Sequence, residues 1–207
     1  MSQTAAQKPA STRERLLELA EQQVLQKGFA STSIEELIAG VGITKSGFFY
    51  HFKDKNDLAR ALMQRYLEDN KRQLDDTFDR AAELHDDPLH GFLIGLKLFA
   101  ELMEKVRDVH PGCIAAAVVY QDQLFDAEVR ALSAEGFLAW RARFRNHLQR
   151  IADRYPPKLP VDLDTLADTI SALVDGAIIL SKALKDGKAL PAQITHYRNY
   201  IKLLFEP

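Results

Sequence analysis

The sequence has little cysteine and almost no net charge. A single cysteine, Cys113, in 207 residues excludes an internal disulfide framework. The 27 lysines and arginines nearly balance the 29 aspartates and glutamates, and the formal charge is −2. The chain as a whole is therefore no polycation that coats nucleic acid indiscriminately, and any contact with DNA must come from a local basic patch.

Segments that would direct the chain to a membrane are also missing. The first residues lack the apolar core that a secretory signal needs. The best candidate for a membrane span, residues 170–184, is interrupted by Asp175 and Lys182. These absences predict a cytoplasmic protein that makes no use of a membrane.

Residue patterns typical of enzymes and metalloproteins are absent as well. The histidines do not have the spacing of metal ligands, and no phosphate-binding loop or nucleophile–base pairing is visible. We therefore expect no metal, no cofactor and no catalysis. Two competing hypotheses remain: an all-α enzyme with an N-terminal hairpin as a structural cap, and a helical adaptor for other proteins. The adaptor would explain the helices but not the basic, aromatic segment described below.

Helical periodicity is what the sequence has in abundance. With 46% hydrophobic residues it can bury a substantial core, and neither sustained period-two alternation nor an internal repeat is visible, so the expected fold is all-α. Residues 1–10 are polar and small and predict a flexible arm. Helices are expected over residues 11–28, 33–41, from 44 onward, 54–82, 88–109, 127–155, 163–185 and 191–205, with a short helical link over 112–124.

Residues 32–55 have the features of two short helices joined by a glycine-bearing turn. Ser33 and Glu36 form a capping-box pattern before the first helix, and Gly40 and Gly42 mark its end. Thr44 can cap the second helix, because its hydroxyl can accept from the free amides of the next turn. This is the arrangement of a helix-turn-helix, whose second helix enters the major groove of DNA.

The second of these helices has a packing face and an outward face. Phe48 and Phe52 share one side at a spacing of four residues, while Ser46, Gly47 and Tyr50 project from the other. Lysines at positions 45, 53 and 55 make the segment locally basic. The alternative is a surface hairpin whose aromatics are core and whose lysines are merely solvated.

Residues 42–55 resemble the DNA-binding signature of the TetR family of transcriptional regulators. The resemblance covers about the first 60 residues well and the rest only through the number and order of helices. It implies a homodimeric, usually repressing regulator, with a three-helix DNA-binding domain and a helical domain that binds an inducer. Two departures from the family pattern have expected consequences. Phe49 stands where a tyrosine is common, so a phosphate contact through a hydroxyl is missing there, and Ile38 stands where alanine is usual, which is expected to spread the helix packing slightly.

The resemblance and the helical wheel together assign DNA-contacting residues. Expected phosphate contacts are Thr32, Thr44, Lys45, Tyr50, His51 and Lys55, and expected base contacts are Lys45, Ser46 and Gly47. The predicted domains are the arm over residues 1–10, the helix-turn-helix domain over 11–55, and an effector-binding and dimerisation domain over 56–207.

The last two predicted helices are candidates for a dimer interface. Residues 163–185 are apolar almost all round and need neighbours on several sides, and residues 191–205 can pack beside them. Two copies of the pair would form a four-helix interface, although both helices could instead only complete the monomer core. The expected interface residues are Leu166, Ile170, Leu173, Ala177, Leu180, Leu184, Tyr197 and Ile201.

An apolar or aromatic small-molecule effector is expected in a cavity of the larger domain. The candidate lining residues are Phe92, Leu96, Phe99, Met103, Cys113, Tyr120, Trp140, Phe144 and Asp175, although residues at such spacings are often plain core. Cys113 begins a predicted helix, whose amides could favour a thiolate that senses oxidants or electrophiles; the alternative is a packed, inert thiol. Asp175 could orient a ligand or satisfy a neighbouring donor.

These patterns predict a ligand-responsive transcriptional regulator rather than an enzyme. We expect it to bind a palindromic operator as a dimer, to act as a repressor, and to be released from DNA when the effector binds.

Overall fold

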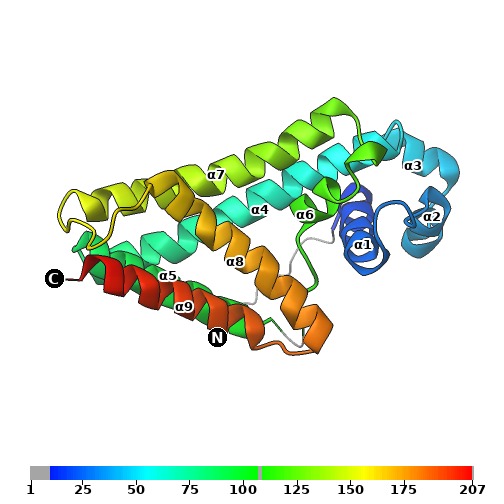
Figure 1. The fold of residues 1–207 in the computed structure, drawn as a ribbon. Coiled ribbons are helices and arrows are strands. Elements are labelled where there is room, and N and C mark those ends of the chain that lie inside the picture. The colour runs from blue at the N-terminus through cyan, green and yellow to red at the C-terminus, as the bar shows by residue number, and fades with distance from the viewer. Residues whose placement is uncertain (1–9, 107–108, 207) are drawn as a thin grey trace, which may run out of the picture.

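In the computed structural model, residues 10–106 and 109–206 are described, and this part of the chain is helical without any strand (Figure 1). The prediction of an all-α fold is confirmed. The expected arm, apart from its last residue, lies outside the described residues. In chain order the elements are α1 (Thr12–Lys27), α2 (Ile34–Val41), α3 (Lys45–His51), α4 (Lys55–Leu84), α5 (Pro88–Glu104), α6 (Ile114–Val119), the 3-10 helix η1 (Asp122–Leu124), α7 (Ala127–Ala152), α8 (Leu163–Leu184) and α9 (Ala189–Phe205).

The capping residues expected from the sequence begin the first three helices. Ser11 accepts from the backbone amide three residues further on at 3.2 Å, and Thr44 does the same at 3.1 Å. Ser33 and Glu36 form the reciprocal capping box, with distances of 3.1 and 3.3 Å. Gly42 ends α2 with φ +74°, a left-handed conformation that suits glycine. Local sequence therefore determines where the helix-turn-helix begins and turns.

The 30-residue helix α4 belongs to both parts of the molecule. Its first turns pack with α1–α3 through Leu58, Leu62 and Met63, and the same hydrophobic cluster includes Ile114 of α6 and Val129 of α7. The N-terminal core therefore extends past the expected domain limit at residue 55. Further along, α4 crosses the larger helical body, where it packs against α5 and α7 (Figure 1).

The body is a layered bundle of α4, α5, α7, α8 and α9. Helix α9 lies against α5 and α8, while α8 also packs on α7 (Figure 1). Several expected boundaries differ. Residues 112–124 contain two short elements, α6 and η1, and α7 ends at Ala152, with Asp153 as its C-cap. Helix α5 ends at Glu104, with Lys105 as its C-cap, and does not continue to the expected end near residue 109.

Candidate DNA-binding surface and effector cavity

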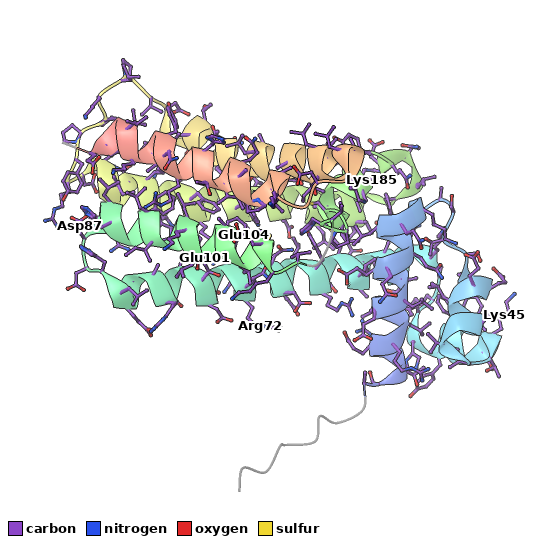
Figure 2. The ribbon with its side chains drawn as sticks, turned by 90° about the horizontal axis from the view of Figure 1, so that it is seen from below. Lys45, Arg72, Asp87, Glu101, Glu104 and Lys185 are labelled. Carbon is purple, nitrogen blue, oxygen red and sulfur yellow. The ribbon has the colours of Figure 1, made fainter. Side chains whose placement is uncertain are left out.

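Helix α3 is anchored by two phenylalanines and presents its other face to solvent. Phe48 and Phe52 are buried, with ring centroids 5.7 Å apart. On the opposite side Tyr50 is 85% exposed, and Lys45 and Ser46 are exposed as well. Figure 2 shows Lys45 pointing outward at the end of the molecule formed by the N-terminal helices. The buried rings fix the orientation of α3, so its exposed side chains are held in place by packing.

The turn before α3 is held by short hydrogen bonds among the residues expected to contact DNA. Thr44 Oγ1 accepts from the Gly47 amide and lies 3.0 Å from Ser46 Oγ. His51 is half-buried, and its ring lies edge-on to that of Tyr50 at 5.0 Å. These contacts order the small residues of the first turn next to Lys45.

Two of the residues expected to contact phosphates make structural contacts within the protein. Thr32 is 1% exposed, and its hydroxyl donates to the Gly28 carbonyl at 3.0 Å. Lys55 Nζ donates to the Phe29 carbonyl at 2.6 Å and lies 4.6 Å from the centre of the Phe29 ring. Burial, followed by the nearby charge of Lys27, lowers the pKa of Lys55. Both side chains stabilise the α1–α2 turn. The Thr32 hydroxyl is buried there, whereas Lys55 is half-buried, and its ammonium has three N–H donors.

The departure at Ile38 does not open the packing of the N-terminal domain. Ile38 is half-buried against the hydrophobic cluster, and α1 and α2 approach each other so closely that a Cβ at Gly40 would lie 2.5 Å from Leu19 Cδ2. The expectation that this departure spreads the helices is therefore not supported.

A cavity of about 80 Å³ lies in the larger domain between α4, α5, α6, α7 and α8. Five of the expected lining residues are there: Phe99, Met103, Cys113, Trp140 and Asp175. The others are not. Phe92, Leu96 and Phe144 are buried in the core of the bundle and do not line the cavity, while Tyr120 follows α6 on the surface with its ring exposed. The presence of an aromatic residue at helical spacing did not distinguish side chains that line the cavity from those buried in the core.

The sequence analysis missed most of the polar lining. Tyr66, Asn70 and Gln73 of α4 reach the cavity, as do His110 and Ser171. The three residues of α4 are spaced four and three apart, which places them on one helix face. That spacing was a usable signal, but a polar stripe on a long helix is equally typical of a solvated face.

Cys113 lies where the cavity meets the first turn of α6. Its Sγ accepts from the hydroxyl of Tyr66 at 3.3 Å and from the amide of Ala116 at 3.4 Å. Burial, reinforced by the carboxylate of Asp175, raises the pKa of the thiol to about 11. The thiol is therefore protonated near neutral pH, and the helix amides do not produce the thiolate that an oxidant sensor needs. The structure favours the alternative of a packed thiol.

The elements around the cavity also contact the N-terminal domain. Helix α6 starts at the cavity and packs on α1 through the N-terminal cluster. Immediately after it, Gln121 Oε1 accepts from the Phe29 amide at 3.1 Å and lies 3.4 Å from the Ala30 amide. Lys182 of α8 donates to the Leu25 carbonyl of α1 at 3.2 Å. A movement of α6 or α8 would therefore change the hydrogen bonds that hold the end of α1 and the α1–α2 turn.

Most of the residues expected at a dimer interface are buried within the protomer. Helix α8 packs on α7, and α9 packs on α5, so much of their apolar surface is already buried in the protomer. The expected interface residues that lie in this core are Leu166, Ile170, Ala177, Tyr197 and Ile201. Leu173 is half-buried against the same core, and of the expected set only Leu180 and Leu184 are exposed.

Exposed apolar side chains remain on the same two helices. Ile179 of α8 is 53% exposed, and Leu203 of α9 is 72% exposed, with Tyr200 one turn before it. Gly176 lies one turn before Ile179, and nothing lies within 4 Å of the position that its Cβ would take. We call the set of Gly176, Ile179, Tyr200 and Leu203 the exposed strip; together with Leu180 and Leu184 of the predicted set, it is the candidate interface.

In the described part of the chain no helix is long and apolar enough to cross a membrane. The same residues contain no group of three or more histidine, cysteine, aspartate or glutamate side chains that could hold a metal ion.

A rigid helix-turn-helix with one exposed face, joined through a shared helix to a larger helical body, defines the molecule as a helix-turn-helix transcriptional regulator. Residues 16–62 match the family model described as bacterial regulatory proteins, tetR family. Residues 93–196 match the model of the transcriptional regulator LmrA/YxaF-like C-terminal domain. The chain belongs to the TetR family, as its resemblance to the family signature predicted.

Named relatives agree with this assignment. The chain is 32% identical to the HTH-type transcriptional regulator AcrR of Shigella flexneri over 89 residues, which are 43% of this chain and 40% of AcrR. It is 21% identical to the repressor DhaR of Mycobacterium sp. strain GP1 over 183 residues, 88% of each chain. The repressor KstR2 of Mycolicibacterium smegmatis is 25% identical over 59% of this chain and 55% of its own length. For AcrR and KstR2 the similarity thus spans about half of each protein or less.

Solved structures show the same fold over almost the whole chain. A TetR-family regulator from Agrobacterium tumefaciens superimposes with a TM-score of 0.76 at 20% identity, covering 96% of this chain and all of that one. A TetR regulator from Chloroflexus aurantiacus gives a TM-score of 0.74 at 26% identity, covering 94% and 96%.

Proposed function

We propose that the protein is a repressor that binds a palindromic operator as a homodimer and leaves it when a small, partly apolar molecule enters the cavity. The single observation that carries this proposal is the exposed face of α3, with Lys45 and Tyr50 outward and Phe48 and Phe52 locked in the core. Such a face can enter a major groove without any rearrangement of its own.

Dimerisation is supported by the exposed strip on α8 and α9. Its apolar side chains would leave water if a second copy packed against them, as in a four-helix interface with twofold symmetry. A twofold dimer presents two recognition helices, and simultaneous binding of both raises the affinity for a palindrome.

Effector response is supported by the size of the cavity and by its neighbours. About 80 Å³ is well below the roughly 300–1,000 Å³ of typical ligand sites, so a ring-bearing ligand must widen the space between the helices. Helices α4 and α6 line it and also pack into the N-terminal cluster. A ligand that binds the widened state better by about 1–3 kcal/mol would weaken DNA binding severalfold to a hundredfold.

The repressing role is supported by the relatives DhaR and KstR2, both named transcriptional repressors. We also assign the protein to the cytoplasm, because a bacterial operator is reached only there.

Selection of bound fragments from random duplexes tests this function. We expect a palindrome whose half-sites lie about one helical turn apart or a multiple of it. Repeating the selection with Lys45→Ala should change the preferred bases, because this side chain is placed to reach base edges. Failure to enrich any sequence would contradict the proposed function.

A further inference from the structure

The geometry points to an organic cation with an aromatic body, such as a protonated arylalkylamine, as the ligand class of the cavity, with its charge beside Asp175. This inference rests on the proposed function in one respect only: the cavity is taken to be the effector site. It adds the charge and the shape of the molecule that the site selects.

Among the described residues that line the cavity, Asp175 is the only ionised side chain. The other titratable lining groups are Tyr66, His110 and Cys113. Burial raises the pKa of the tyrosine and of the thiol, so both are neutral near pH 7. Burial, followed by the charge of Lys182, lowers the pKa of His110, so its imidazole is uncharged as well. The net charge of the cavity wall is therefore negative.

No cation of the described residues neutralises this carboxylate. Lys182, two turns further along α8, donates instead to the Leu25 carbonyl, and Asp175 takes part in none of the ion pairs among the described side chains. Burial raises the pKa of Asp175, although a hydrogen bond with the Cys113 thiol acts in the opposite direction, so this carboxylate has a neutral partner but no cation beside it among the described residues. A ligand cation would compensate it, whereas a ligand anion would be repelled by it.

Another polar group of α8 has no hydrogen-bond partner among the described residues. Ser171 Oγ is buried without a hydrogen bond to any described residue, and it lies one helical turn before Asp175 on the cavity face. An ammonium group has three N–H donors and no acceptor, so it can serve the carboxylate and this hydroxyl oxygen together. A ligand carboxylate could accept from the Ser171 hydroxyl, but the charge of Asp175 would repel it.

The remaining wall suits the aromatic body of such a cation. Phe99 and Trp140 lie edge-to-face, with centroids 6.1 Å apart, and Phe137 lines the cavity beside them. Aromatic faces attract cations and repel anions, and Met103 and Ile178 extend the apolar surface. The polar and the aromatic parts of the cavity wall therefore both favour a positively charged ligand.

A matched set of three ligands tests the inference: phenethylamine, phenethyl alcohol and phenylacetate, which share a phenyl group and differ in charge. Binding is measured by calorimetry and by the fluorescence of Trp140, the only tryptophan of the chain. We expect the amine to bind roughly tenfold or more tightly than the alcohol, and the acid to bind most weakly. An alcohol as tight as the amine, a tighter acid, or no binding of the amine would overturn the inference.

Asp175→Asn should reduce the affinity for the amine to that for the alcohol while leaving the alcohol unchanged. The matched control is Asp164→Asn, which removes the same charge from α8 at a position outside the cavity and should leave both affinities as they are. Thermal unfolding checks that each variant folds. If Asp175→Asn does not fold, the three-ligand series on the unaltered protein still decides whether the cavity prefers a cation.

Release of DNA is measured separately, so the two proposals can fail independently. If the amine binds at Asp175 and the operator complex persists, the effector role in the proposed function is wrong and the ligand class stands. If the alcohol binds as well as the amine and releases DNA, the ligand class is wrong and the effector role stands.

Discussion

At the scale of single residues, a change at Tyr50 should affect DNA binding without affecting the stability of the fold. Its ring is 85% exposed, and its side chain forms no hydrogen bond with the described residues. Tyr50→Phe should weaken binding to all duplexes by a few-fold, about 1 kcal/mol for one phosphate hydrogen bond, and leave the unfolding temperature unchanged. Fluorescence anisotropy with operator and unrelated duplexes measures this. A loss confined to one sequence would assign the hydroxyl to a base instead.

His147 makes a pH-dependent contribution to stability. Its ring packs against those of both Phe78 and Phe92, at centroid distances of 5.1 and 5.2 Å. Burial, then Arg143 and Arg150, lowers its pKa from 6.5 to about 4. The unfolded chain therefore takes up a proton first as pH falls, and the stability that the neutral ring supplies is present above pH 6.5 and is lost between 6.5 and 4.

The expected size of this effect is measurable by denaturant unfolding. Moving from pH 7 to about pH 5 should lower the unfolding free energy by about 2 kcal/mol through this histidine, given roughly 1.4 kcal/mol per pKa unit. His147→Phe should remove that part of the pH dependence. If the variant and the original protein lose the same stability between these two pH values, the assignment to His147 is wrong.

At the scale of elements, the caps were predictable from the sequence and the use of the apolar faces was not. Ser11, Ser33 and Thr44 begin helices as expected, because capping depends on residues within one turn. Helix α8 is apolar on several sides, and periodicity alone does not say which side a protomer buries. Leu166 and Ile170 therefore lie in the core, while Leu180 is exposed.

The site was predictable in part for the same reason. The outward face of α3 follows from the spacing of Phe48 and Phe52 within one short helix. The cavity depends on how five helices meet, which no local pattern specifies. From the sequence, the Thr32 hydroxyl was expected to contact a phosphate. Its hydrogen bond to the Gly28 carbonyl could not be foreseen, because this bond exists only once the α1–α2 turn has formed.

The contact between η1 and the α1–α2 turn gives a prediction at the same scale. Gln121→Ala removes the acceptor for the Phe29 and Ala30 amides, so these amides should exchange with deuterium severalfold faster. Gln123→Ala changes an exposed residue of η1, two positions after Gln121, and should leave exchange in the turn as it was. Equal exchange in both variants would show that Gln121 does not hold the turn.

At the scale of the whole molecule, the exposed strip on α8 and α9 should decide assembly. Leu203→Glu places a charge on a side chain that is 72% exposed in the protomer and is expected to be buried in the dimer. The variant should sediment as a folded monomer and lose most of its affinity for a palindrome. Leu138→Glu, on an exposed position of α7, is the control. A Leu203→Glu protein that remains a dimer would place the interface elsewhere.

The central claim is that a dimer inserts two α3 helices into DNA. It is tested most directly by titrating the selected operator with the ligand-free protein over a range of salt concentrations. We predict two protomers on each duplex and an affinity that falls steeply as salt rises, because several phosphates are neutralised. Absence of binding at low salt, or binding of a single protomer with no dependence on salt, would contradict the account.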